Sequence, residues 1–321
     1  MGNILVSVIV ITYNSAKYVL ETLESVKNQT YQNIELIISD DASKDKTLDI
    51  CSDWLMNNKE RFVKTELITV TENTGIPANC NRGVRTSNGA LIKMIAGDDI
   101  LIEDCVNIGV REYLRQPFDL LQTNFIAYDE EFSSKNLLGI QKPEFIRSFF
   151  NLNAKNQYKA FKYRNFILTP SVFMNADVFK KIMFDEEFKI IEDYNFWIMA
   201  AKSGFRFSYL DNVTVKYRVR SDSVQSKEEK IFFSEEQIAL LKEVRKKYYR
   251  GYSFVINNLI DKYYIFLDRV GLNNKNRKIN GYIYYLSGTF FSWLLFLYLR
   301  YLNLSKSFNY SSTLRKIFFY Y

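Results

Sequence analysis

Three pairs of adjacent carboxylates are the residues of this sequence best suited to chemistry. They are Asp40-Asp41, Asp98-Asp99 and Glu192-Asp193, and each follows a short apolar run. Two like charges that lie so close together are costly unless a cation or a hydrogen-bond donor shares the site. The 321 residues include no histidine. This excludes hydrolases that need an imidazole base and zinc sites ligated by histidine, so that any chemistry must use carboxylates, Lys, Arg, Tyr, Ser or a bound ion.

The Asp98-Asp99 pair follows the apolar run "LIKMIAG", residues 91–97. Carboxylates are hard oxygen ligands for Mg²⁺ or Mn²⁺, which often bridge one or two protein carboxylates to the phosphates of a substrate. The alternative is a helix N-cap, because Glu103 and Asp104 are acidic residues typical of a first helical turn. The position after an apolar strand and Gly97 favours a metal.

The other two pairs allow a functional and a structural interpretation each. Asp40-Asp41 could accept hydrogen bonds from a nucleobase or ribose, or could cap the helix that follows Ser43. Glu192-Asp193 could supply a general base, which must be a carboxylate in a chain without histidine. It could also be the acidic first turn of a helix.

The elements that must position these pairs alternate between strand and helix over the first 130 residues. This alternation predicts an α/β fold with a mostly parallel, doubly wound sheet, which binds ligands at the carboxyl ends of its strands. Thr12, Tyr13 and Asn14 follow the first strand. No glycine-rich phosphate loop is present in "TYNSAKY", residues 12–18. The predicted strands are 6–12, 34–39, 65–71, 90–95 and 118–128, and the predicted helices are 16–28, 44–57, 77–86 and 103–115.

Beyond residue 130 the pattern becomes less regular. We expect an irregular stretch over 131–165, a strand or loop over 166–173, a helix over 187–203, one or two strands over 207–219 and helices over 230–250 and 252–270. These expectations divide the chain into a nucleotide-binding and catalytic domain, 1–226, and a helical C-terminal region, 227–321. The three cysteines, Cys51, Cys80 and Cys105, are predicted to be buried free thiols.

The C-terminal region is basic and rich in aromatic residues. Residues 227–321 hold 16 Lys and Arg against 7 Asp and Glu, whereas residues 1–226 hold 27 against 29. Residues 279–299 carry no charge and could span a membrane, lie on its surface or pack as an ordinary helix. The basic flanks favour association with an anionic membrane surface; a helical cap, a contact between copies and nucleic-acid binding are the alternatives.

At this point the chain resembles a family 2 glycosyltransferase with the fold called GT-A. The matching stretches cover roughly residues 6–220, in the family's order and at its separations. They are "VSVIVITYN", "ETLESVKNQTYQNIELIISDDASKDKT", "ENTGIPANCNRG", "GALIKMIAGDDIL" and "IIEDYNFWIMAAKSGF".

The resemblance implies a nucleotide-diphosphate sugar donor, with UDP favoured, and a divalent metal as cofactor. It implies that Asp41 contacts the nucleotide base, with Thr12, Tyr13 and Asn14 on the adjacent loop. Asp98 and Asp99 match the region that holds the metal on the donor diphosphate, and Asp193 matches the catalytic base. Two departures stand out. Ala96 replaces the first aspartate of an Asp-x-Asp-Asp pattern, and Cys80 replaces an arginine, for which Arg82 or Lys93 could compensate electrostatically.

We therefore expect an inverting sugar transferase that acts on a hydroxyl of a glycan or of a lipid-linked acceptor. It would work on the cytoplasmic face of the cell membrane, without a nucleic-acid partner, and association between copies is left open. Two alternatives remain: a degenerate protein that binds sugar nucleotides without catalysis, prompted by Ala96 and Cys80, and a nucleotidyltransferase. The latter normally has a glycine-rich basic loop after the first strand, which this sequence lacks.

Overall fold

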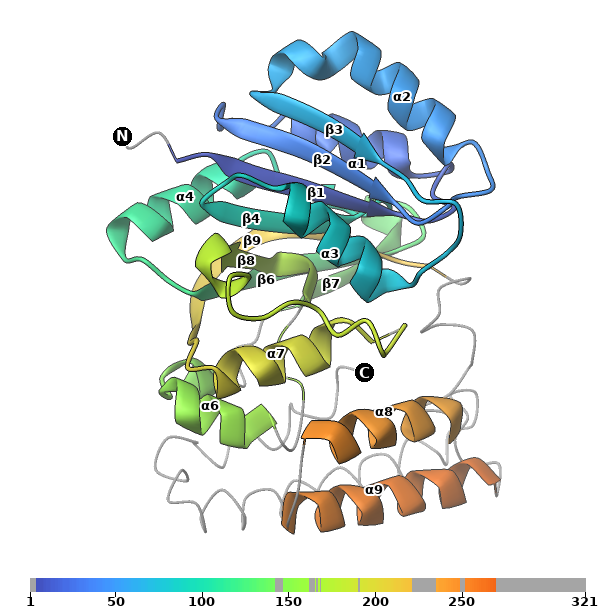
Figure 1. Cartoon of the computed structure of the whole chain (residues 1–321), viewed down its shortest axis with the longest axis vertical. Helices are drawn as coiled ribbons and strands as arrows, with labels where there is room; N and C mark the ends of the chain where they lie inside the picture. Colours follow the sequence, from blue (N-terminus) through green and yellow to red (C-terminus); the bar gives the residue numbers. More distant parts are fainter. Residues whose placement is uncertain are drawn as a thin grey trace. The chain divides into compact units, whose positions relative to one another are not determined.

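Strands and helices alternate through the first part of the chain in the computed structural model (Figure 1). The structure describes residues 4–141, 147–161, 165, 167, 169–189, 191–220, 235–248 and 252–269. By their internal contacts these residues belong to two compact units. One comprises residues 1–143 and 167–219, and the other residues 144–166 and 220–321. The predicted division at residue 226 stays a prediction.

The first four strands form the parallel half of the sheet, in the order β3-β2-β1-β4. Val8 of β1 lies between Leu36 of β2 and Lys93 of β4 in the hydrogen-bonded register. All four strands run in the same direction, so that their carboxyl ends meet at one edge. The bounds are β1 Val6–Thr12, β2 Ile34–Asp40, β3 Lys64–Ile68 and β4 Leu91–Ala96.

Helices cover both faces of this half. Val8 and Val10 of β1 share one core with Leu23 and Val26 of α1. Ile9, which points to the opposite face because side chains alternate along a strand, meets α3 instead. A β-carbon built on Gly83 of α3 would lie only 2.4 Å from the Ile9 Cγ2 atom. The helices are α1 Val19–Lys27, α2 Thr47–Asn58, α3 Ile76–Thr86 and α4 Cys105–Arg115.

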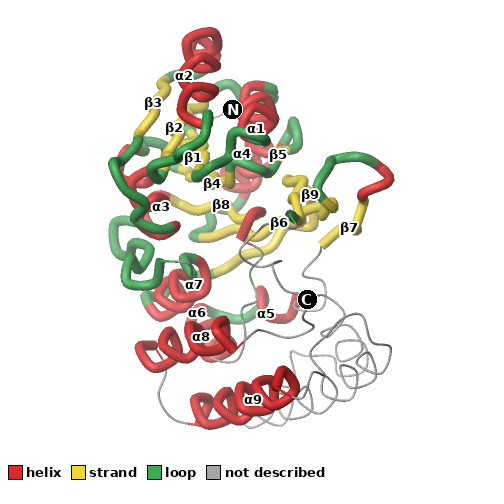
Figure 2. The backbone as a smooth tube through the Cα atoms, turned by 90° about the vertical axis from the view of Figure 1, so that its right-hand side faces the viewer, coloured by secondary structure: helices red, strands yellow, loops and turns green. Residues whose placement is uncertain are grey.

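The other half of the sheet is mixed and continues in the order β8-β6-β9-β5, with β7 paired to β6 in a hairpin (Figure 2). β8 is antiparallel to both β4 and β6, and β6 runs parallel to β9. The strands are β5 Ile100–Leu101, β6 Leu120–Asp129, β7 Leu137–Gln141, β8 Val172–Asn175 and β9 Phe207–Val219, and the helix α7 spans Asp193–Lys202.

The second unit is helical where it is described. Its helices are α5 Arg147–Phe150, α6 Ala154–Phe161, α8 Glu235–Tyr248 and α9 Tyr252–Arg269. Arg245 of α8 places one guanidinium nitrogen 2.7 Å from each carboxylate oxygen of Asp261 on α9. None of the helices that the structure describes is both long and apolar enough to cross a membrane. Residues 279–299 lie outside the described residues.

Two local expectations were wrong. Residues 131–165 are not irregular throughout, because they contain β7, α5 and α6. The helix expected from residue 187 begins only at Asp193, since residues 184–189 form a segment that packs against α3. The prediction of buried free thiols is confirmed for Cys51, Cys80 and Cys105.

Candidate active site

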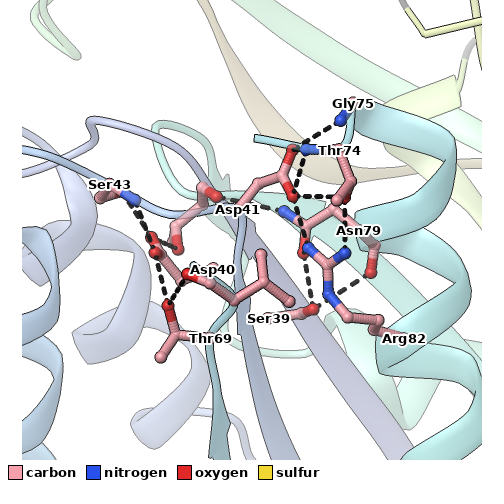
Figure 3. A network of polar contacts seen from close by, with 11 residues as sticks. Ser39, Asp40, Asp41, Ser43, Thr69, Thr74, Gly75, Asn79 and Arg82 are labelled. Atoms are coloured by element: carbon pink, nitrogen blue, oxygen red, sulfur yellow. Dashed lines mark hydrogen bonds and ion pairs between the residues drawn. The ribbon is translucent and has the colours of Figure 1, made fainter. Parts of the chain in front are cut away.

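Asp41, directly after β2, is the centre of a network that reaches the first turns of α3 (Figure 3). Its carboxylate accepts hydrogen bonds from the Thr74 hydroxyl at 2.7 Å and from the Gly75 N–H at 2.8 Å. The Arg82 guanidinium lies 2.6 Å away in an ion pair in which the Asp41 side chain is only 3% exposed. Burial acts to raise the pKa of Asp41, but the hydrogen bonds from Thr74 and Arg82 outweigh it and hold the pKa below its usual value.

These contacts make Asp41 an organiser of the loop that opens α3. Gly75 has φ +96°, where an L side chain is strained, and a β-carbon there would lie 2.9 Å from the Lys189 carbonyl oxygen. Contact of Asp41 with a nucleobase stays a prediction, and a base would have to share a carboxylate that already accepts several donors. Arg82 forms the ion pair with this carboxylate. It is one of the two residues that were suggested to compensate for the arginine replaced by Cys80.

The loop after β1 is pinned to the loop after β2. The buried Thr12 hydroxyl donates to Asp40 at 2.8 Å, so that its side chain supports the loop from inside. The Asn14 side chain accepts the Lys44 N–H at 2.8 Å, with φ +49° at Asn14. Tyr13 is 47% exposed. Contact of these three loop residues with a nucleotide stays a prediction.

Asp98 and Asp99 point to different environments. Asp99 is 2% exposed, and its Oδ1 atom accepts the backbone N–H of Arg218 at 2.9 Å. Burial, and then the charge of Asp98, raise the pKa of Asp99 well above its usual value. Asp98 is half-buried and follows the exposed Ala96 by two residues. Neither aspartate caps a helix, because Asp104 holds the N-cap position of α4.

Arg218 of β9 supports this acidic turn, and the sequence interpretation missed it. Its side chain donates to the Asp98 carbonyl oxygen at 2.8 Å and to the Glu21 carboxylate at 2.9 Å, and also to the Glu130 carbonyl oxygen. The guanidinium lies between two aromatic rings, 4.2 Å from the centroid of Tyr18 and 4.1 Å from that of Phe132. Arg218 is one of two arginines in "VKYRVR", residues 215–220, and nothing in that stretch signals this role.

Glu192 and Asp193 begin α7. The Asp193 carboxylate accepts the Thr169 hydroxyl at 2.8 Å through one oxygen and the Tyr194 N–H at 2.6 Å through the other. Burial, and then the charge of Asp193, raise the pKa of Glu192 to about 8. The pair occupies an acidic first helical turn, which is compatible with both interpretations drawn from the sequence.

Two of the three acidic pairs, Asp98-Asp99 and Glu192-Asp193, share one neighbourhood. Burial raises the pKa of the Tyr217 hydroxyl on β9, and the charges of Asp99, Asp98, Glu192 and Asp193 raise it further. Both pairs therefore lie within electrostatic range of one side chain. Residues 184–189 join this neighbourhood to α3, since the Ile76 N–H donates to the Lys189 carbonyl oxygen at 3.0 Å. The Asn81 side chain also donates to the Phe184 carbonyl oxygen at 2.9 Å.

The residues at this edge fit a divalent cation shared with a phosphate ligand. Among the described residues, no group of three or more acidic, cysteine or histidine side chains forms a complete metal cage. Mg²⁺ and Mn²⁺ sites of nucleotide enzymes often need only one or two protein carboxylates, because substrate phosphates and water supply the rest. Asp98 offers such a carboxylate. The burial of Asp99 and its hydrogen bond to Arg218 make it a support for the turn.

The parallel half of the sheet carries acidic residues directly after β2 and β4, at the edge where α/β enzymes bind their ligands. The family model described as glycosyl transferase family 2 matches residues 7–183, more than half of the chain. The chain belongs to this family, and the expected glycosyltransferase activity class is confirmed.

Curated relatives and solved structures agree with this assignment. The glycosyltransferase GlyG of Streptococcus pneumoniae is 28% identical over 235 residues, which cover 70% of this chain and 74% of the relative. The Escherichia coli protein WfaP, named as a UDP-Glc:alpha-D-GlcNAc-diphosphoundecaprenol beta-1,3-glucosyltransferase, is 26% identical over 272 residues, covering 83% of this chain and 98% of WfaP.

Solved structures of two similar proteins confirm the expected GT-A fold. TarS 1-349 of Staphylococcus aureus, in complex with UDP-GlcNAc, is similar with a TM-score of 0.58 and 21% identity, covering 76% of this chain and 66% of that one. In a longer TarS structure the similarity covers 39% of that chain. The mannosyltransferase PcManGT of Pyrobaculum calidifontis, in complex with GDP-Man and Mn²⁺, has a TM-score of 0.56 and 16% identity, covering 83% of this chain and 73% of that one.

Proposed function

We propose that this glycosyltransferase is inverting and moves a sugar from a metal-bound nucleotide-diphosphate sugar to a hydroxyl of a glycan or lipid-linked acceptor. The observation that carries the proposal is the common neighbourhood of the Asp98-Asp99 and Glu192-Asp193 pairs around Tyr217. A site that transfers a glycosyl group needs a place for the leaving diphosphate and, next to it, a base for the acceptor.

In this proposal Asp193 takes the proton of the acceptor hydroxyl. The hydroxyl oxygen then forms a bond to the anomeric carbon, while the bond from that carbon to the donor phosphate oxygen breaks and the diphosphate leaves with the electron pair. A single displacement inverts the configuration at the anomeric carbon. A divalent cation bound at Asp98 would neutralise the charge that develops on the diphosphate. Tyr13 would stack on the base beside the Asp41 network, with Thr12 and Asn14 fixing that loop.

A UDP-sugar is the donor we favour, since the similar TarS structures contain UDP-GlcNAc or UDP and WfaP is named for UDP-Glc. The name of WfaP also describes a diphosphoundecaprenol acceptor, which supports a lipid-linked acceptor here. We extend the proposal to association of the basic C-terminal region with the cytoplasmic membrane face, supported by its charge.

The test replaces Asp193 by Asn and measures UDP release from UDP-glucose and UDP-GlcNAc with Mn²⁺, water serving as acceptor. We expect the turnover to fall by about 10²–10⁴-fold, as on removal of a general base, while thermal stabilisation by the donor persists. The matched control is Asp177→Asn, an exposed carboxylate paired with Lys180 on the surface. Unchanged turnover in Asp193→Asn would show that Asp193 is not the base.

The wild-type measurements separate the alternatives. A chain that is stabilised by UDP-sugars yet releases no UDP from any donor in a panel extended to GDP-mannose would support the degenerate, non-catalytic interpretation. Formation of pyrophosphate from UTP and a sugar phosphate would instead identify a nucleotidyltransferase.

A further inference from the structure

The Asp193 carboxylate is held by a residue that lies 24 positions earlier in the chain. The Thr169 hydroxyl donates to Asp193 Oδ2 at 2.8 Å, while Oδ1 accepts the N–H of Tyr194 within α7. One oxygen is thus tied to its own helix and the other to a separate turn, Thr169–Ser171. Two such contacts on different oxygens restrict rotation of the carboxylate about its Cβ–Cγ bond.

The turn itself is anchored by a buried polar network. The Lys93 ammonium donates to the Pro170 carbonyl oxygen at 2.6 Å. The Thr123 hydroxyl donates to the Ser171 carbonyl oxygen at 2.7 Å, and the Gln122 amide donates to the Ser171 hydroxyl at 2.6 Å. Lys93, Gln122, Thr123 and Ser171 are all completely buried. Buried polar groups are costly unless every partner is in place, so this network specifies a single position for the turn.

Lys93 is an unexpected part of this anchor. It lies on the central strand β4, and its ammonium also contacts the Phe173 ring, 4.9 Å from the centroid. In the described part of the chain its ammonium is not within ion-pair distance of any carboxylate. A lysine that loses its hydration to bind a main-chain carbonyl contributes less to stability than an apolar residue of similar volume would. Its hydrogen bond to the Pro170 carbonyl oxygen suggests that Lys93 serves to fix the turn Thr169–Ser171.

We propose that Thr169 is a positioning residue for Asp193, and that Lys93, Gln122, Thr123 and Ser171 hold the turn from which it acts. This inference rests on the proposed function, in which Asp193 is the base. A hydrogen bond donated to a carboxylate favours its charged form and fixes the oxygen that receives the proton. Without the Thr169 hydroxyl, we expect Asp193 to rotate into a poorer position and its charged, proton-accepting form to be less favoured.

The test compares Thr169→Val, which keeps the shape and removes the hydroxyl, with Thr169→Ser, which keeps the hydroxyl. For UDP release from UDP-glucose with Mn²⁺, we expect Thr169→Val to lower kcat by about 10-fold and to leave KM within about twofold, since the contact acts on the chemical step. Thr169→Ser should restore kcat to within about threefold of the wild type. Thr65→Val, on the edge strand β3, is the matched control.

The pH profile supplies a readout that a loss of stability would not move. The acid limb of kcat should shift to higher pH by about half a unit to one unit in Thr169→Val, because the charged carboxylate loses a donor. The titratable groups that share the site are Glu192 on α7, Tyr217 on β9 and the Asp98-Asp99 pair, and Lys93 on β4 lies against the turn that carries Thr169. Wild-type kcat and pH profile in Thr169→Val, or equal impairment in the Val and Ser variants, would overturn the inference.

A double-mutant cycle separates this inference from the proposed function. If Thr169 acts through Asp193, Thr169→Val should cause no further loss in the Asp193→Asn background. Full activity of Asp193→Asn would contradict the proposed function itself. If Asp193→Asn is inactive and Thr169→Val is fully active, the proposed function is supported and only the role of Thr169 is refuted.

Discussion

At the scale of single residues, the site is built from carboxylates that have unlike tasks in spite of their similar sequence context. Asp41 and Asp99 accept hydrogen bonds inside the protein, whereas Asp98 lies half-buried near the exposed Ala96. Asp41 accepts the N–H of Gly75, and Asp99 accepts the N–H of Arg218 on the distant strand β9. The departure at position 96 places a small, exposed alanine two residues before Asp98.

The two members of the Asp98-Asp99 pair should respond differently to substitution. We expect Asp98→Asn to keep the melting temperature of the ligand-free protein and to lose the additional stabilisation that Mn²⁺ gives with UDP-glucose. We expect Asp99→Ala to lower the unfolding free energy by about 1–3 kcal/mol, because the buried N–H of Arg218 loses its acceptor. Thermal shift and urea unfolding measure the two effects. A full metal-dependent shift in Asp98→Asn would contradict the assignment.

The Asp41–Arg82 ion pair should be essential to stability. Removing one partner of a buried pair leaves an uncompensated charge, so that Asp41→Ala should lower the unfolding free energy by about 3–5 kcal/mol. The exposed Asp177–Lys180 pair provides the control, and Asp177→Ala should cost less than about 1 kcal/mol. Equal effects in the two variants, measured by urea unfolding, would refute the role given to Asp41.

At the scale of elements, the sequence predicted the strand–helix alternation well because β1, β2 and β4 are short segments dominated by Val, Ile and Leu. The predicted strand 6–12 coincides with β1. Elements defined by distant partners were missed. The two-residue strand β5 exists through its pairing with Val215 and Lys216 of β9, more than a hundred residues away. The inward orientation of Asp99 likewise depends on Arg218, which no local pattern connects to it.

The buried Lys93 on β4 should make stability depend on alkaline pH. Burial lowers the pKa of Lys93 to about 8, although the nearby Cys105 and Asp99 act to raise it. Between about pH 8 and the unfolded value of about 10.4, the unfolded chain binds more protons, so that the Lys93 contribution to stability rises with pH. The difference in unfolding free energy between wild type and Lys93→Met should therefore grow in favour of the wild type from pH 8 to 10.

The slope of that difference can reach about 1.4 kcal/mol per pH unit for one proton. Urea unfolding at several pH values measures it, and subtraction of the two curves removes the groups common to both proteins. The exposed Lys180→Met should show no such slope. A difference that does not vary with pH would mean that Lys93 stays fully charged in the folded protein.

At the scale of the whole molecule, the charge is divided unevenly along the chain. After Val244 there are 13 Lys and Arg against 2 Asp and Glu. A nearly neutral catalytic part and a basic C-terminal part suit an enzyme whose acceptor is presented at an anionic surface. The uneven charge can be read from the sequence alone. The arrangement of the candidate site could not be predicted in this way, because it depends on contacts between residues that are distant in the sequence.

Binding to vesicles should depend on the basic sequence "NNKNRK", residues 273–278. We expect the full chain to float with vesicles that contain phosphatidylglycerol, and not with purely zwitterionic vesicles, and to be released by high salt. Replacing Lys275, Arg277 and Lys278 by Gln should weaken binding by roughly 10²-fold, at about 1 kcal/mol for each charge.

The matched control replaces three exposed lysines of the first unit, Lys46, Lys59 and Lys202, by Gln, which changes the net charge equally. Vesicle binding of this control should stay close to that of the wild type. Equal loss in both variants would show that net charge alone drives binding. Retention on DNA at moderate salt would contradict the expectation that nucleic acid is not a partner.

Each of three helices that flank the sheet carries one buried thiol, which can report how often that helix opens. Cys51, Cys80 and Cys105 lie on α2, α3 and α4, and none is more than 2% exposed. Burial raises the pKa of Cys51 to about 12, that of Cys105 to about 11 and that of Cys80 well above its usual value. Because the thiolate is the reactive form, an alkylating reagent must wait until a helix opens. The alkylation rates of the three cysteines would thus measure the opening of α2, α3 and α4 separately, without any engineered label.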